Sequence, residues 1–195
     1  MLLKLIQFLT ILLTALALVP AGAHVLALPN KIHLPQEPYF AAQQIYRGWE
    51  FAGIVLVAAI VADAWLAWLL RGQPTAFWLG LGGALCMAAT LAVFFVWTLP
   101  ANLATDNWLS TPPNWQVLRA RWEYAHAAGA ALTLAGLCLV VASVLGTSPA
   151  AIGLSADASD SAAAQAPGLG SAPACSGSRA RSRTVRAGSD CRRRG

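Results

Sequence analysis

Ionisable and aromatic side chains gather at the start of one long apolar stretch, residues 114–146. The first third of this stretch contains Trp115, Arg119, Arg121, Trp122, Glu123 and His126. A histidine near a glutamate and an arginine is a candidate acid or base, because imidazole titrates near neutral pH and neighbouring charges easily move its pKa. The remaining two thirds are apolar and small, so we predict a membrane-spanning helix with a candidate site at its head.

Helical spacing sorts these side chains into two stripes. The first stripe, which is mostly polar, is Arg119, Glu123, His126, Ala130 and Thr133. The second stripe, which is aromatic and small, is Trp115, Trp122, Gly129 and Gly136. We expect the first stripe to present ionisable groups and the second to pack closely against another helix.

The composition is that of a protein with lipid as its solvent. Hydrophobic residues make up 57% of the chain and charged residues 11%, whereas soluble domains carry about 25% charged residues. The net charge of +5 comes from the end of the chain, where seven arginines lie within residues 179–194. The rest is close to neutral, so we expect contact with membrane lipids and no nucleic-acid binding surface.

Four apolar segments are long enough to cross a bilayer. We predict helices near residues 3–28, 42–70, 75–99 and 114–146. Because proline disrupts helix interiors, we expect residues 29–42 to form a loop. We expect Pro100 to end the third helix for the same reason. The predicted fold is all-α: an integral membrane antiparallel four-helix bundle over residues 1–146.

The residues at the two ends of the chain allow predictions about their structure and their location. The first segment also fits a cleaved signal peptide, with Lys4, an apolar core and the small residues 21–23. Its apolar run continues to Leu28, which favours a membrane span. Residues 147–195 are rich in Ala, Ser, Gly, Pro and Arg without periodicity, and we expect a disordered tail. The basic N-terminus, the short turn at residues 71–74 and the arginines favour termini in the cytoplasm.

Antiparallel threading would bring four helix ends to one membrane face. These ends carry the candidate site residues His24, Arg47, Trp49, Trp97, Asn102, Arg121, Trp122, Glu123 and His126. We expect one cavity at the mouth formed by residues 29–42 and 101–113, surrounded by His24, Asn102, Trp122, Glu123 and His126, with Arg47 and Trp49 at its rim. Asp63 lies thirteen residues after Glu50, about 20 Å along a helix, so we expect it at the far end with a structural role.

Metal and cofactor motifs are not apparent. The four cysteines form no Cys-x-x-Cys pair and no Cys/His spacing of a zinc site. We therefore predict no metal and no cofactor. A haem or quinone carrier that uses His24 and His126 is an alternative, although the sequence has no haem-attachment motif.

Four short motifs resemble the anthrone-oxygenase-like family of small four-helix membrane proteins, mostly catalogued in bacteria as a domain of unknown function. They are Gly22-Ala23-His24 with Pro29, Tyr46-Arg47-Gly48-Trp49, Pro100-x-Asn102 and Arg121-Trp122-x-x-x-His126. The resemblance covers residues 5–146 and implies the inner (plasma) membrane of a bacterium. Members often carry an arginine one turn after the histidine, where this chain has residues 127–130, Ala-Ala-Gly-Ala.

The resemblance implies a reaction and residue roles. Fungal members oxidise anthrones to anthraquinones with dioxygen, without an obvious metal or flavin motif. By resemblance, His126 would be the base and Asn102 or Arg121 would stabilise the oxyanion. The substrate-binding residues would be His24, Arg47, Trp49, Trp97, Trp122 and Glu123. The alternative is a non-catalytic membrane protein that packs with a partner, which the sequence does not identify.

Overall fold

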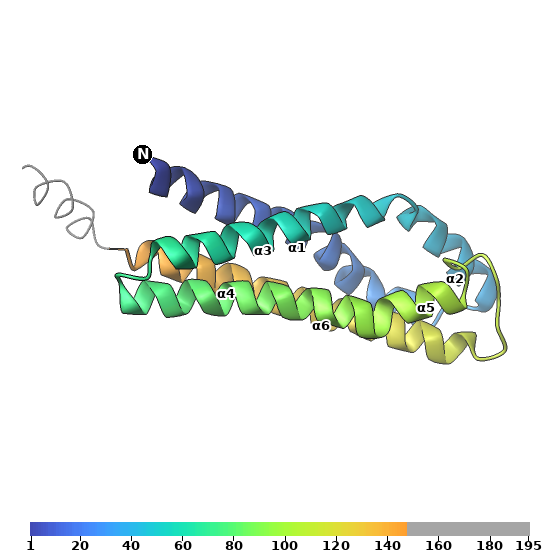
Figure 1. Cartoon of the computed structure of the whole chain (residues 1–195). Coiled ribbons are helices and arrows are strands. Elements are labelled where there is room, and N and C mark those ends of the chain that lie inside the picture. Colours follow the sequence, from blue (N-terminus) through green and yellow to red (C-terminus); the bar gives the residue numbers. More distant parts are fainter. Residues whose placement is uncertain (148–195) are drawn as a thin grey trace, which may run out of the picture. The chain divides into compact units, whose positions relative to one another are not determined.

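The computed structural model describes residues 1–147, which form helices and no strands (Figure 1). The elements are α1 (Leu2–Lys31), α2 (Gln36–Gln43), η1 (Gln44–Tyr46), η2 (Trp49–Phe51), α3 (Ala52–Leu69), α4 (Pro74–Val93), η3 (Phe94–Thr98), α5 (Leu99–Ala104) and α6 (Trp115–Leu145). The all-α prediction is confirmed for this part of the chain. The predicted tail, from residue 148 onward, lies outside the described residues.

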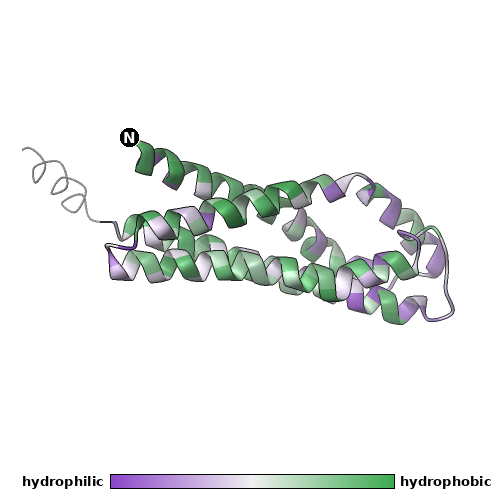
Figure 2. Ribbon diagram, in the orientation of Figure 1, coloured by the Kyte–Doolittle hydropathy of each residue, from purple (hydrophilic) through white to green (hydrophobic). Residues whose placement is uncertain are grey.

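Four helical stretches are long and apolar enough to cross a membrane. They are Leu2–Lys31, Trp49–Leu69, Pro74–Ala104 and Trp115–Leu145. Each exposes large apolar side chains, and Figure 2 shows hydrophobic residues along the length of all four. More than half of the surface of Phe8, Val61, Trp78 and Leu134 is uncovered. Such surfaces are unfavourable in water and suit contact with lipid.

Each long helix packs against two others. The contacting pairs are α1 with α3, α3 with α4, α4 with α6, and α6 with α1. Small residues bring α4 and α6 close, because Gly83 leaves room for Val140. The Ser143 hydroxyl crosses the same interface and donates a hydrogen bond to the Ala76 carbonyl at 2.6 Å.

The prediction of a loop over residues 29–42 is wrong. α1 continues through Pro29 to Lys31, since a proline near the end of a helix removes only its own hydrogen bond. α2 then begins at Gln36. Pro38 lies in the first turn of α2, where a missing N–H has no intrahelical partner to lose.

Two predicted helix boundaries also differ. Gly48 has φ of 90°, a conformation that favours glycine, and it separates η1 from η2 before α3 begins at Ala52. Pro100 does not end the third long helix, which continues to Ala104. The preceding turn, Phe94–Thr98, is π-helical. A wider turn of this kind relieves the clash between the proline ring and the carbonyl one turn earlier.

Candidate functional site

Five aromatic rings meet where α1, η1, η2 and α6 come together, and we call them the ring cluster: His24, Tyr46, Trp49, Trp122 and His126. The ring centroids of His24 and His126 are 4.2 Å apart. Trp122 lies against both, with centroids 4.9 Å from His24 and 3.9 Å from His126. Tyr46 and Trp49 contact His24 at 4.4 and 5.6 Å. The helix ends therefore bring together four of the predicted site residues, His24, Trp49, Trp122 and His126, around Tyr46.

His126 has a defined pattern of hydrogen bonding. Its Nδ1 lies 2.9 Å from the carbonyl oxygen of Trp122, one turn earlier on α6. A carbonyl oxygen can only accept, so Nδ1 carries the hydrogen. A neutral imidazole with its hydrogen on Nδ1 keeps its lone pair on Nε2. The local helix geometry therefore presents Nε2 as the basic atom of His126.

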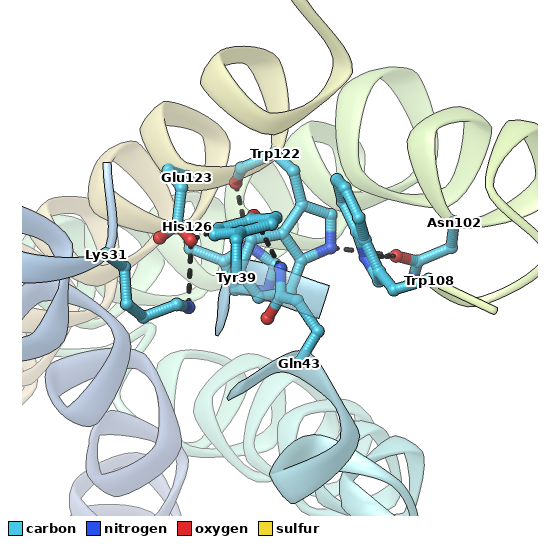
Figure 3. A network of polar contacts seen from close by, with 8 residues as sticks. All are labelled: Lys31, Tyr39, Gln43, Asn102, Trp108, Trp122, Glu123 and His126. Atoms are coloured by element: carbon cyan, nitrogen blue, oxygen red, sulfur yellow. Dashed lines mark hydrogen bonds and ion pairs between the residues drawn. The ribbon is translucent and has the colours of Figure 1, made fainter. Parts of the chain in front are cut away.

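A buried ion pair lies beside the ring cluster (Figure 3). The Lys31 ammonium is 2.8 Å from Glu123 Oε1, and the two side chains are only 7% and 0% exposed. The ammonium also lies over the rings of Tyr46 and Trp122, at 4.5 and 4.7 Å from their centroids. Cation–π contacts of this kind are strongest when water is excluded.

Two further side chains extend the ion pair into a chain of hydrogen bonds. Gln43 Nε2 donates to the Tyr39 hydroxyl at 2.6 Å, and that hydroxyl donates to Glu123 Oε1 at 3.1 Å. Burial, with the Glu123 charge next, raises the pKa of Tyr39 above its ordinary value. The same two causes raise the pKa of Tyr46. Both phenols therefore stay protonated, and Tyr39 keeps the hydrogen that it donates.

Asn102 fixes the orientation of two indoles. Its Oδ1 accepts hydrogen bonds from Nε1 of Trp122 at 2.8 Å and from Nε1 of Trp108 at 3.2 Å (Figure 3). Both acceptor positions of this oxygen are therefore occupied. Asn102 acts on the ring cluster through Trp122.

Three predicted site residues lie elsewhere. Arg121 and Trp97 line an apolar groove of about 550 Å³ between α4, η3 and α6. Arg47 is exposed and donates to Gln44 Oε1 at 2.7 Å, beside a second groove over α2. Neither groove is lined by His24 or His126. Where the single cavity was expected, rings of the described residues pack against one another.

Sequence reasoning did not include four residues of the buried site: Lys31, Tyr39, Gln43 and Tyr46. Lys31 and Tyr39 fall in residues 29–42, which were expected to be a loop. Gln43 and Tyr46 fall at the expected start of the second helix. Lys31 follows His24 by seven residues, which is two helical turns and the same face. That spacing would have indicated Lys31 if α1 had been expected to continue past Pro29.

Three buried polar atoms of the site have neither a hydrogen-bond nor an ion-pair partner among the described residues: His24 Nδ1, Gln43 Oε1 and Glu123 Oε2. Unpaired buried groups are rare in folded proteins, and His24 Nδ1 and Glu123 Oε2, beside the ring cluster, are available to a bound molecule. Within residues 1–147, no three His, Cys, Asp or Glu side chains lie close enough together to hold a metal ion. Comparisons with protein-family models, with curated proteins and with solved structures found no match.

Proposed function

We propose that this chain is a multi-pass membrane protein that oxidises a small hydrophobic aromatic molecule with dioxygen, as its resemblance to anthrone oxygenases implies. Its four long helices would form an antiparallel bundle in a bacterial inner membrane, with both termini in the cytoplasm. Their exposed apolar surfaces support the insertion. The ring cluster would then lie near the membrane surface that carries α2 and the loop before α6.

One observation carries the enzymatic part: the Nδ1 contact of His126 with the Trp122 carbonyl leaves Nε2 as a base among aromatic rings. Nε2 would remove a proton from the acidic methylene of an anthrone-like ketone. The resulting anion is rich in electrons and transfers them to dioxygen. Overall, the methylene loses two hydrogens and gains one oxygen atom as a carbonyl, while the second oxygen atom leaves with the two hydrogens as water.

The roles of the neighbouring residues follow from their positions. We assign stabilisation of the negative charge to the Lys31 ammonium, because it is the buried cation next to the rings. Arg121 is exposed on another face of α6, so we do not assign this role to it. Asn102 positions Trp122, and His24 Nδ1 is available to a substrate oxygen.

Substrate binding requires a ring to move, since the cluster is filled. Trp49 is the ring most easily displaced: it is 38% exposed, whereas Trp122 is only 5% exposed. Trp49 also follows Gly48, whose positive φ marks a break between two helical segments. We expect a flat substrate to take the place of the Trp49 ring against His24.

The test is oxidation of anthrone by the full-length protein in lipid nanodiscs under air. We expect anthraquinone to form faster than in empty nanodiscs, with one dioxygen consumed for each anthraquinone formed. A Trp49→Ala variant should alter the KM for anthrone more than kcat, because this ring covers the site. A wild-type rate equal to that of empty nanodiscs would contradict the proposal.

A non-catalytic packing or accessory protein is the second candidate. The observations in its favour are that neither groove reaches the histidines and that Lys31 and Glu123 already pair with each other. A haem carrier is disfavoured by geometry. Ring centroids 4.2 Å apart leave no room for a porphyrin between His24 and His126.

A further inference from the structure

Asp63 is a fully buried carboxyl in α3 that belongs to neither the ring cluster nor the ion pair. Its Oδ1 lies 3.2 Å from the Thr14 hydroxyl of α1. Thr14 precedes His24 by ten residues, about 15 Å along the helix axis. Asp63 Oδ2 has no hydrogen-bond partner among the described residues.

The hydrogen bonding of this carboxyl is weak. The Thr14 hydroxyl donates to Asp63 Oδ1 at 3.2 Å and lies closer, at 2.8 Å, to the carbonyl oxygen of Thr10. Its single hydrogen is therefore shared between two acceptors. The Thr10 hydroxyl donates to the Ala62 carbonyl at 3.3 Å and not to Asp63. A buried carboxylate with one shared donor is poorly stabilised, which favours the protonated form.

The charged groups on the surrounding helices are distant. Just after α3, Arg71 lies eight residues from Asp63, about 12 Å along the axis, and donates to the Trp68 carbonyl. Before α3, Glu50 in η2 lies thirteen residues from Asp63, about 20 Å along the axis. On α1, Lys4 is ten residues before Thr14, about 15 Å away along the axis. Lys31 lies seventeen residues after Thr14, about 25 Å along the axis.

The other two long helices offer no counter-charge either. α4 contains no charged residue. The arginine, glutamate and histidine residues of α6 all lie in its first half: Arg119, Arg121, Glu123 and His126. Glu123 is paired with Lys31, whereas an ionised Asp63 would be unpaired in the apolar interior, which is unfavourable.

We propose that Asp63 is a proton-binding site: a neutral carboxylic acid at neutral pH, and the residue of this chain that a membrane-soluble carbodiimide modifies. In that reaction the carboxyl proton passes to one carbodiimide nitrogen, and the carboxyl oxygen bonds to the central carbon. The acyl group then shifts to the other nitrogen. The whole reagent is added and nothing leaves. The proposal is independent of the reaction assigned to His126.

Infrared spectroscopy of the full-length protein in liposomes tests the protonation. We expect a carbonyl stretch of a protonated carboxyl at neutral pH, which disappears in Asp63→Asn and remains in Asp106→Asn, where the carboxyl is exposed. Thr14→Val should move the band to higher frequency, because it removes the hydrogen-bond partner. A wild-type spectrum without the band, or a band that persists in Asp63→Asn, would overturn the assignment.

Dicyclohexylcarbodiimide and peptide mass spectrometry test the reactivity. We expect the adduct on the peptide that contains Asp63, with at least ten times less on the Glu123 peptide, and none at position 63 in Asp63→Asn. An adduct chiefly on Glu123, or none on Asp63, would overturn the claim of a reactive proton site.

Discussion

Trp122 joins the parts of the site through three different groups. Its carbonyl fixes the tautomer of His126, its indole N–H binds Asn102, and its ring lies beneath the Lys31 ammonium. Burial of this residue at 5% exposure keeps all three contacts away from water. The orientation of the candidate base therefore depends on one tryptophan, which is among the candidate residues predicted from the sequence.

The Lys31–Glu123 pair gives a prediction at the residue scale. Removing one partner leaves the other charge buried and unpaired, so Lys31→Met or Glu123→Leu should lower the free energy of unfolding by about 3–5 kcal/mol. The double variant Lys31→Met/Glu123→Leu should lose clearly less than the sum of the two. Thermal unfolding in detergent measures all three. Additive losses would mean that the two side chains are not paired.

The sequence predicted part of the site because helical periodicity is reliable within long apolar segments. Arg121 shows its limit: five residues before His126, it lies about 140° around the helix, and so it faces the groove with Trp97. The stripe of Arg119, Glu123 and His126 already excluded it. Tyr39 was missed for another reason: its position depends on the short helix α2, which begins after Pro35 and contains Pro38.

At the scale of elements, the long apolar segments were predictable and their ends were not. Length and hydropathy decide whether a segment is a span, and the segments near 114–146 and 75–99 match α6 and α4. Proline rules failed at Pro29 because it lies near the end of α1, where it removes only its own hydrogen bond, and at Pro100 because a π-helical turn precedes it. The break at Gly48 depends on one positive φ, which the expected continuous helix did not include.

The contact between α4 and α6 gives a prediction at this scale. A Cβ at Gly83 would lie 2.6 Å from Val140 Cγ2, so close that the Val140 side chain or one of the two helices must shift. Gly83→Ala should therefore destabilise the protein by about 1–3 kcal/mol. At the neighbouring Gly82, a Cβ would meet Leu139 Cδ1 at 3.4 Å, an ordinary contact.

Gly82→Ala is the matched control, and it should change stability by no more than about 0.5 kcal/mol. Thermal unfolding of the detergent-solubilised protein measures the stability of both variants. Helix propensity favours alanine over glycine at both positions, so equal losses for the two would show that the close approach to Val140 does not determine the effect.

At the scale of the whole molecule, the proposed antiparallel insertion makes a prediction about sidedness. The turn at Gly72 and the segment at His33 should face opposite sides of the membrane. In a background without native cysteines, Gly72→Cys should react with an impermeant maleimide only after the cytoplasmic side is opened. His33→Cys should react from the outside of intact cells. Labelling of both from the same side would contradict the arrangement.

The proposed function depends most on His126 as the base, and one comparison of rates tests this role. Anthrone oxidation is measured in nanodiscs for wild type, His126→Ala and His33→Ala, the last being a matched change at an exposed histidine outside the ring cluster. Loss of a general base typically costs about 10²–10⁴-fold in rate. We predict such a loss for His126→Ala and a wild-type rate for His33→Ala. Equal rates in all three proteins would contradict the assignment.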